Sequence, residues 1–267
     1  MKANLRYLQR STESVLRKRK FFELTIHDAP IEELIVYLDE RIVQRFATHV
    51  IPVNPHVYQI GIEDESYFGI LEQGDVVLCD GVGILLGSKV AGDPIKHRVV
   101  GTDLMMGLSG LAAHKGYSVF LLGGLNGAAH QCAKVLLKHW PGLNICGVEE
   151  LPFFNNIDRL ENDGTIERIN RSRADILFVS LGAPKQEQWI ARNRHLLESR
   201  LMMGVGASFN LIGGMVRRAP HWIRSAGFEW LFRLSQEPGR LWKRYLIGNP
   251  RFLYHVIKER FVSNKGS

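Results

Sequence analysis

The sequence predicts a doubly wound α/β fold built around a parallel sheet, and three observations lead to this prediction. Short apolar runs recur through the middle of the chain, and each run ends at glycine and small or polar residues. The runs are almost continuously apolar, which is typical of strands buried on both faces of a parallel sheet. Segments with the apolar spacing of helices follow two of these runs, and strands that alternate with helices are typical of α/β domains.

The expected strands can be placed in chain order by the turns that end them. The first lies in "HVIPVNPHVYQIGI" and ends at Asn54-Pro55. The later strand-and-turn units are residues 74–87, 117–136, 174–193 and 200–214. Ligands of such folds bind outside the carboxyl ends of the strands, so the turn residues are expected to share one crevice. These residues are Asn54, Asp80, Gly81, Gly123, Gly124, Gln186 and Gly206.

The pattern changes after Gly214, and this change defines the predicted domains. They are a basic N-terminal arm at residues 1–22, an α/β catalytic domain at 23–214 and a C-terminal helical appendage at 215–267. The appendage has no strand-and-turn unit and predicts two or three short helices, broken at Glu237-Pro238-Gly239 and at Gly248-Asn249-Pro250. Three of the five tryptophans lie there, interleaved with arginines. The appendage is therefore expected to present a basic, aromatic face.

The net charge of +7 is unevenly distributed along the 267 residues. Residues 1–20 carry +6, residues 21–215 carry −7 and residues 216–267 carry +8. Two basic ends on an acidic body indicate an anionic partner, such as nucleic acid, a phospholipid surface or a phosphorylated ligand. No apolar run approaches the roughly 18 residues of a spanning helix, and the N-terminus lacks the apolar core of a secretory signal. Three widely spaced cysteines fit a reducing compartment.

Two of the turns carry residues that suit group-transfer chemistry. Asp80 follows an apolar run and precedes a glycine, so its carboxylate is either a general base at a strand end or a cap or solvated turn residue. The Gly123-Gly124 turn is either a loop whose N–H groups approach a phosphate before a helix or an ordinary tight turn.

The segment "KHRVVGTDL" adds a third group of candidates just before another helical pattern. Arg98 is suited to pair with a phosphate, Thr102 is a candidate for the same site or an ordinary N-cap, and Asp103 follows it. No cluster of histidine, aspartate and glutamate has metal-ligand spacing, so no metal or other cofactor is expected.

Six motifs, in their order and spacing, resemble the WecG/TagA/CpsF family of bacterial glycosyltransferases. They cover about residues 50–255 and are "DGVGILLG", "RVVGTDLM", "GYSVFLLGG", "ADILFVSLGAPKQEQWI", "GVGASFNLIGGMVRRAP" and "EWLFRLSQEPGRLWKRYLIGNPRF". The resemblance implies a Rossmann-like α/β domain with an appendage that faces the membrane. It also implies an inverting, metal-independent hexosyltransferase that moves a sugar from a UDP-sugar to a sugar on an undecaprenyl-diphosphate lipid, in the biosynthesis of exopolysaccharide or another cell-surface polysaccharide.

The same resemblance implies roles for individual residues. Asp80 would be the catalytic base, and Arg98 with the Gly123-Gly124 turn would face the donor's diphosphate. Gln186 would hold the nucleotide-sugar through its neutral amide, whereas its neighbours Lys185, Glu187 and Gln188 are interpreted as the polar first turn of a helix. The full implied donor site is Asn54, Gly81, Arg98, Thr102, Asp103, Gly123, Gly124, Gln186 and Gly206.

For the appendage, the resemblance implies contact with the acceptor's diphosphate and with an anionic membrane. The residues assigned to this role are Arg217, Arg218, Arg233, Arg240, Lys243 and Arg244. The implied location is cytoplasmic, bound peripherally to the inner face of the bacterial cell membrane, with no nucleic-acid partner and with the oligomeric state left open. Truncation after about residue 215 is expected to leave a soluble body without activity on the lipid acceptor.

Two departures from the family pattern leave the transferred sugar open. Pro52 stands where relatives often have threonine, and the first fifty residues match poorly. Two other classes of protein share part of this pattern. A nucleotide-dependent oxidoreductase is disfavoured because "DGVGILLG" has the spacing G-x-G-x-x-x-G and no ribose-binding acid follows it. A nucleic-acid-binding protein would explain the basic C-terminus but not the residues at the strand ends.

Overall fold

The computed structural model describes residues 16–151 and 164–263. The strands are β1 (Lys18–Phe21), β2 (Leu24–His27), β3 (Thr48–Val53), β4 (Val76–Cys79), β5 (Ser118–Gly123), β6 (Asn144–Glu149), β7 (Ile176–Ser180) and β8 (Leu201–Gly204). The helices of the body are α1 (Ile31–Val43), α2 (Pro55–Glu63), α3 (Glu65–Glu72), α4 (Val82–Ala91), α5 (Gly101–Lys115), α6 (Ala128–His139), α7 (Thr165–Ser172), α8 (Lys185–Asn193) and α9 (Ser208–Ile212). The C-terminal segment contains α10 (His221–Ser225), α11 (Glu229–Gln236), α12 (Pro238–Trp242), the wide-turned η3 (Lys243–Gly248) and α13 (Asn249–Ser263).

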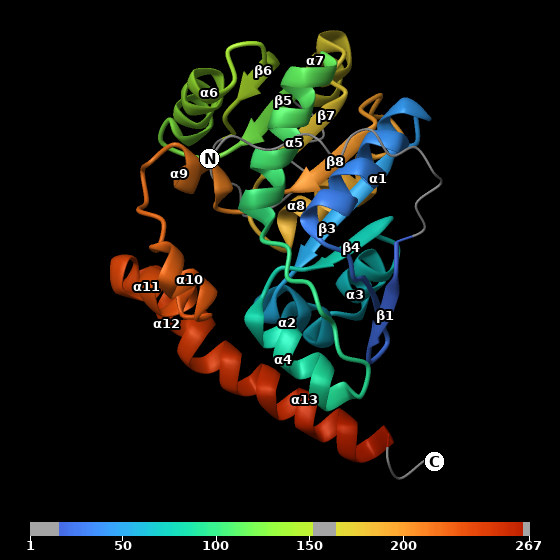
Figure 1. Ribbon diagram of the computed structural model, residues 1–267, viewed down its shortest axis with the longest axis vertical. Helices are drawn as coiled ribbons and strands as arrows, with labels where there is room; N and C mark the ends of the chain where they lie inside the picture. Colours follow the sequence, from blue (N-terminus) through green and yellow to red (C-terminus); the bar gives the residue numbers. More distant parts are fainter. Residues whose placement is uncertain (1–15, 152–163, 264–267) are drawn as a thin grey trace.

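The described strands form a single sheet in the order β1-β2-β4-β3-β8-β7-β5-β6. β1 pairs antiparallel with β2, and the remaining neighbours pair in parallel. Helices cover both faces of the sheet (Figure 1), which confirms the predicted doubly wound α/β fold. Parallel pairing places the carboxyl ends of β2 to β8 at one edge, where the crevice was expected.

The strands are apolar throughout because both of their faces are buried. In β5, Val119 and Leu121 pack into the cluster that includes side chains of α1, α5 and α6. The alternate residues Phe120 and Leu122 pack into a second cluster, with side chains of α7 and α8. This alternation along a fully buried strand is the physical basis of the continuous apolar runs.

The helices of the C-terminal segment differ from the prediction at one of the two expected breaks. The first break is confirmed, because α11 ends at Gln236 and α12 begins at Pro238. The second prediction is wrong, since η3 continues directly into α13 at Asn249. Pro250 lacks an N–H group and its ring crowds the preceding turn, and the wider turn of η3 makes room for it.

The continuous α12-η3-α13 helix is part of the body's core along one side. Its buried stripe is Leu241, Tyr245, Phe252 and Val256. The ring of Phe252 lies 6.1 Å from that of Phe21 and 5.9 Å from that of Tyr58, and α13 runs beside α2 and α4 (Figure 1). Truncation near residue 215 would uncover this apolar surface. We therefore expect the truncated body to be less stable than the full chain, a consequence that the sequence pattern did not indicate.

The end of the basic N-terminal segment belongs to the sheet. Lys18–Phe21 form the edge strand β1, and Arg19 forms an ion pair of 2.7 Å with Asp93. At least one basic residue assigned to the arm is therefore used within the fold. The rest of the predicted arm, residues 1–15, lies outside the described residues.

Candidate active site

Asp80 and Asn54 lie side by side because β4 and β3 are neighbouring parallel strands. The register pairs Val53 with Cys79, and the Asp80 N–H donates to the Val53 carbonyl at 2.9 Å. Asn54 caps α2, and its Oδ1 accepts from the N–H groups of its first turn. Asp80 does not cap the helix that follows it; its Oδ1 accepts from the Gly101 N–H, at the start of α5, at 3.1 Å.

The environment of Asp80 favours a carboxylate that takes up a proton readily. Burial raises the pKa of Asp80 above its ordinary value, and the negative charge of Glu229 raises it further. The Gly101 hydrogen bond and the positive charges of Arg98 and Arg244 act in the opposite direction, without cancelling the rise. A partly buried carboxylate with a raised pKa at a strand end has the character of a general base.

Arginines from two parts of the chain gather around Asp80. Arg244, from η3, reaches Asn54 with an Nη2–Oδ1 distance of 3.3 Å. Burial lowers the pKa of Arg244, and the positive charge of Arg233 lowers it further. Among the described residues, the Nε atoms of Arg233 and Arg244 are buried without a hydrogen-bond partner. Partly buried cations with buried, unused Nε donors are suited to receive an anion.

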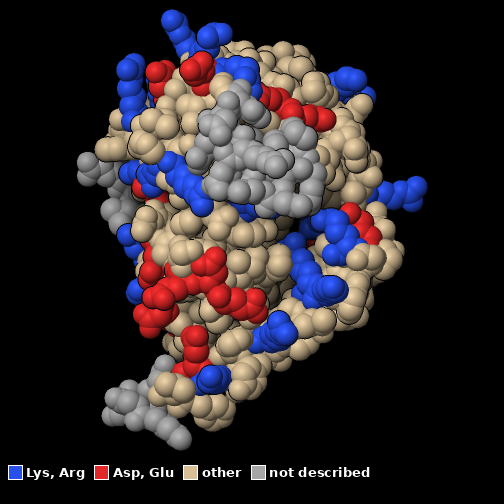
Figure 2. Space-filling view, turned by 180° about the vertical axis from the view of Figure 1, so that it is seen from behind, with Lys and Arg blue, Asp and Glu red and all other residues tan. Residues whose placement is uncertain are grey.

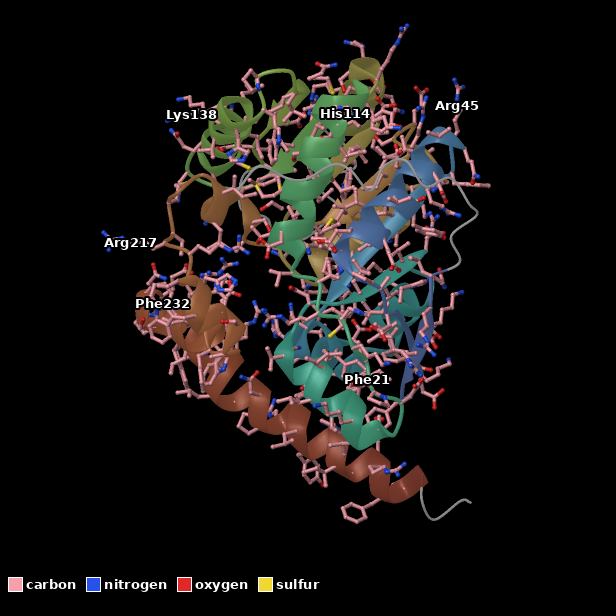
Figure 3. The ribbon with its side chains drawn as sticks, in the orientation of Figure 1. Phe21, Arg45, His114, Lys138, Arg217 and Phe232 are labelled. Atoms are coloured by element: carbon pink, nitrogen blue, oxygen red, sulfur yellow. The ribbon has the colours of Figure 1, made fainter. Side chains whose placement is uncertain are left out.

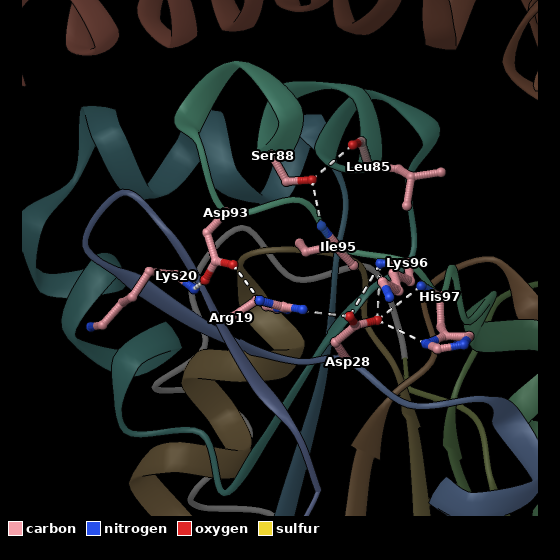
Figure 4. A network of polar contacts seen from close by, with 9 residues as sticks. All are labelled: Arg19, Lys20, Asp28, Leu85, Ser88, Asp93, Ile95, Lys96 and His97. Atoms are coloured by element: carbon pink, nitrogen blue, oxygen red, sulfur yellow. Dashed lines mark hydrogen bonds and ion pairs between the residues drawn. The ribbon is translucent and has the colours of Figure 1, made fainter.

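The two residues that precede Arg98 belong to a network centred on Asp28, which follows β2 (Figure 4). The buried Asp28 carboxylate accepts from the N–H groups of Lys96 and His97 and contacts the His97 ring at 2.9 Å. Arg19 lies 3.7 Å from the same carboxylate. The network fixes the segment that leads into Arg98, whose Nη2 donates to the Arg224 carbonyl at 3.2 Å.

Thr102 and Asp103, at the start of α5, are engaged with other parts of the protein. The Thr102 hydroxyl is buried and lies 2.8 Å from the Ser208 hydroxyl, so Thr102 joins α5 to α9 and is not an N-cap. Asp103 pairs with Arg218 at 2.7 Å and with Arg224 at 3.7 Å. These contacts connect the C-terminal segment to the α/β body at the start of α5.

The Gly123-Gly124 turn lies at the end of β5, as predicted, and both glycines have positive φ. A Cβ on Gly123 would lie 2.6 Å from the Ser180 carbonyl oxygen. The N-terminus of α6 beyond the turn already holds a carboxylate, because Glu150 accepts from the N–H groups of Gly127 at 2.9 Å and Ala129 at 3.0 Å. A phosphate at this helix end would have to replace Glu150.

Gln186 is buried and connects two turns of the same edge. Its Oε1 accepts from the N–H groups of Gly182, after β7, at 3.2 Å and Gly206, after β8, at 2.9 Å. Its Nε2 donates to Glu187 at 2.7 Å. Glu187 does lie in the first turn of α8, as predicted, but its side chain is fully buried rather than a polar surface residue.

The basic residues of the C-terminal segment fall into two groups. Arg218, Arg233 and Arg244 are partly buried, and the contacts above place Arg218 beside Asp103 and Arg244 beside Asn54. Arg217 is exposed and points away from the body (Figure 3). Arg240 pairs with Glu237 at 2.7 Å, and the Lys243 ammonium lies 5.6 Å from the Trp242 ring centre. Figure 2 shows basic side chains in a diagonal band along this segment.

Three residues at this edge were not singled out from the sequence. Arg224 pairs with Asp103, and its carbonyl accepts from Arg98. Glu150 accepts from the N–H groups at the start of α6, and His56 lies in the first turn of α2. Burial, together with Arg244, lowers the pKa of His56 to about 4, so its ring is neutral near pH 7. None of them stands in a recognisable pattern, because each acquires its surroundings only from distant parts of the chain.

Within the part of the chain that the structure describes, no group of three or more histidine, cysteine, aspartate or glutamate side chains is arranged to hold a metal ion. None of the helices in these described residues has the length and apolarity needed to cross a membrane.

A partly buried carboxylate and arginines at the carboxyl ends of the strands of a doubly wound α/β fold are typical of enzymes that act on phosphorylated ligands. The sequence profile of the Glycosyl transferase WecG/TagA/CpsF family matches residues 19–266, and the chain belongs to this family. It is therefore a glycosyltransferase, which sets aside the oxidoreductase and nucleic-acid-binding alternatives.

Curated relatives carry a more specific name. An N-acetylglucosaminyldiphosphoundecaprenol N-acetyl-beta-D-mannosaminyltransferase of Bacillus subtilis (strain 168) is 30% identical over 243 residues, covering 88% of this chain and 91% of its own. A relative with the same name from Bacillus spizizenii is 29% identical, covering 86% of this chain and 84% of its own. A third, from Staphylococcus aureus (strain MRSA252), is 30% identical over 213 residues, or 79% of this chain and 80% of its own.

Proposed function

We propose that the protein transfers an N-acetylhexosamine, N-acetylmannosamine in the first instance, from a UDP-sugar to N-acetylglucosamine carried on undecaprenyl diphosphate. The observation that carries the proposal is the gathering of Arg98 and Arg244 around the partly buried Asp80. Such a site offers a base for a sugar hydroxyl and cations for a diphosphate in one place. The names of the relatives support the acceptor and the sugar.

In this proposal Asp80 removes the proton from the acceptor hydroxyl as that oxygen attacks the anomeric carbon of the donor. The bond from this carbon to the UDP oxygen breaks on the opposite face, so the configuration inverts. UDP leaves with its negative charge next to the guanidinium groups of Arg98 and Arg244. Fixed cations in a site with little water stabilise developing charge more strongly than they would in water.

The contacts of each predicted residue refine its part in the proposal. We assign direct contact with the donor to Asn54, Arg98 and the backbone of Gly81. The backbone N–H and carbonyl of Gly206 are hydrogen-bonded to Gln186 and Ser180, so we assign Gly206 to the shape of the site. Thr102, Asp103 and Gln186 use their side chains within the protein, so we assign them to positioning the site. The Gly123-Gly124 turn serves as a wall of the donor pocket.

We further propose that the C-terminal segment binds an anionic membrane surface on the cytoplasmic side. Next to its buried stripe, about 100° around the helix axis, the α12-η3-α13 helix exposes Trp242, Leu246, Leu253, Ile257 and Phe261, with the spacing of one helical face. The basic residues Lys243, Arg251 and Lys258 are exposed on the same helix. Apolar side chains flanked by cations are suited to the headgroup region of a bilayer.

Vesicle binding tests this surface. Replacing Leu253, Ile257 and Phe261 together with glutamine should lower binding to vesicles containing phosphatidylglycerol at least about tenfold, because apolar area buried in the bilayer is lost. A matched control replaces Val135 and Leu137, which are exposed on α6, and should bind as the wild type does. Co-sedimentation measures both. If the triple variant binds the vesicles as strongly as the control variant does, the membrane contact is not on this helix.

The pH dependence of kcat/KM tests Asp80 as the base. Because its pKa is raised, activity should fall on the acid side at a pH above the ordinary range of an aspartate. Replacing Arg98 with glutamine removes a charge that lowers this pKa, so the acid limb should move to higher pH even though the rate also falls. If the acid limb is unchanged in this variant, Asp80 is not the group whose protonation lowers the activity.

Product analysis tests the reaction itself. With UDP-N-acetylmannosamine and polyprenyl-diphosphate-linked N-acetylglucosamine, we expect a lipid product that is heavier by one N-acetylhexosamine residue in its mass spectrum. Polyprenyl-diphosphate-linked glucose serves as the acceptor control. A lipid that stays unchanged with every UDP-N-acetylhexosamine offered would overturn the proposal.

A further inference from the structure

We propose that Glu187 is a positioning residue that holds the two turns after β7 and β8 through Gln186. The inference rests on the proposed function, because it takes these turns to line the donor site. It assigns a task to a residue whose place in a helical first turn gave no reason to expect one.

The contacts form a continuous chain from α3 to the edge of the sheet. The Tyr67 hydroxyl, on α3, donates to Glu187 Oε2 at 3.0 Å, and Gln186 Nε2 donates to Glu187 Oε1 at 2.7 Å. Gln186 Oε1 then accepts from the N–H groups of Gly182 and Gly206. Tyr67 and Glu187 are fully buried and Gln186 is 5% exposed, so these hydrogen bonds have little competition from water.

The chemistry of the chain favours a carboxyl group at position 187. Two backbone N–H groups fix the oxygen of the Gln186 amide, so its NH₂ group must face Glu187. The Tyr67 hydroxyl is a second donor aimed at the same group. Above its pKa, which burial raises to about 7, the carboxylate is ionised and accepts from both donors. A glutamine at 187 has one acceptor oxygen, so in either orientation of its amide one of the two donors, the Gln186 NH₂ group or the Tyr67 O–H, loses its acceptor.

The strand ends add two constraints to the same assembly. A Cβ on Gly204 would lie 2.6 Å from Gln186 Nε2, so the end of β8 closes tightly over the amide. The Ser180 hydroxyl, at the end of β7, donates to the Gly206 carbonyl at 2.6 Å. The two turns are thus tied directly to each other and through Gln186, and Glu187 is the group that orients Gln186.

The experiment compares Glu187→Gln and Tyr67→Phe with Tyr117→Phe. The control removes a similar hydrogen bond, because the Tyr117 hydroxyl donates to Asp39 at 2.7 Å, away from the two turns. Hydrogen exchange is measured for peptides covering residues 181–186 and 205–209, and kcat and donor KM are measured separately.

For Glu187→Gln we expect exchange in both peptides to accelerate about tenfold, the equivalent of roughly one lost hydrogen bond. Donor KM should rise about tenfold while kcat changes little, since binding common to ground and transition states is lost. Tyr67→Phe should show the same changes to a smaller degree, and it supplies the result if Glu187→Gln does not fold. Tyr117→Phe should leave both peptides as in the wild type.

Wild-type exchange of both peptides in a folded Glu187→Gln or Tyr67→Phe variant would overturn the inference. Equal acceleration in Tyr117→Phe would also overturn it, because the effect would then be a general loss of stability. The exchange measurement needs no substrate, so it decides the inference even if the proposed transfer reaction fails.

Discussion

Replacing Asp80 with asparagine is expected to lower the rate of sugar transfer by about 10²–10⁴-fold, the usual contribution of a positioned general base. The side chain keeps its shape, and its oxygen can still accept from the Gly101 N–H. What is lost is the ability to take the proton of the acceptor hydroxyl. The rate of product formation at saturating donor and acceptor measures the effect.

The folded state of this variant should be as stable as the wild type or more so. Because the folded-state pKa of Asp80 is raised, ionisation of Asp80 opposes folding at neutral pH, and a neutral side chain removes that penalty. Asp75→Asn is the matched control, since Asp75 precedes the same strand at the opposite edge and accepts from the His49 N–H at 2.8 Å. The control should transfer sugar normally. A near-normal rate in Asp80→Asn would remove Asp80 from the role of base.

Replacing Phe252 with alanine is expected to lower the free energy of unfolding by about 3 kcal/mol, as large-to-small changes in a core do. Phe252 is 5% exposed and its ring lies against those of Phe21 and Tyr58. The variant would leave a cavity between α13 and the body. Urea unfolding followed by circular dichroism measures the change.

The adjacent residue provides the control on the same helix. Leu253 is 55% exposed, so Leu253→Ala should change stability by no more than about 0.5 kcal/mol. If Phe252→Ala is equally mild, α13 does not contribute to the core of the body in solution. In that case the α12-η3-α13 helix would be an independent appendage, as the sequence alone suggested.

The edge of the sheet could be predicted because its signals are local. Each apolar run is long enough for one buried strand. The residue after the run therefore lies at the carboxyl end of that strand, where the chain leaves the sheet. This is why Asn54 and Asp80 were expected together, although 26 residues separate their strand ends. The arginines of the C-terminal segment were recognised as a group, but their division between crevice and surface depends on tertiary contacts.

The burial of Glu187 could not be predicted because its partner is remote. Lys185, Gln186, Glu187 and Gln188 have the composition of an exposed first turn, while Tyr67 lies 120 residues away in the sequence. Burial raises the pKa of Glu187 to about 7, a property that no local pattern indicates. The continuous helix through Pro250 is a similar case, in which the wide turn of η3 and packing of α13 outweigh a local helix-breaking signal.

Release of UDP across a panel of UDP-sugars, with undecaprenyl-diphosphate-linked N-acetylglucosamine as the acceptor and a strong chelator present, tests the central claim most directly. We predict release that requires the acceptor, is greatest with UDP-N-acetylmannosamine and falls in Asp80→Asn. Absence of acceptor-dependent UDP release from every donor in the panel, with or without the chelator, would contradict transfer from a UDP-sugar at the Asp80 site.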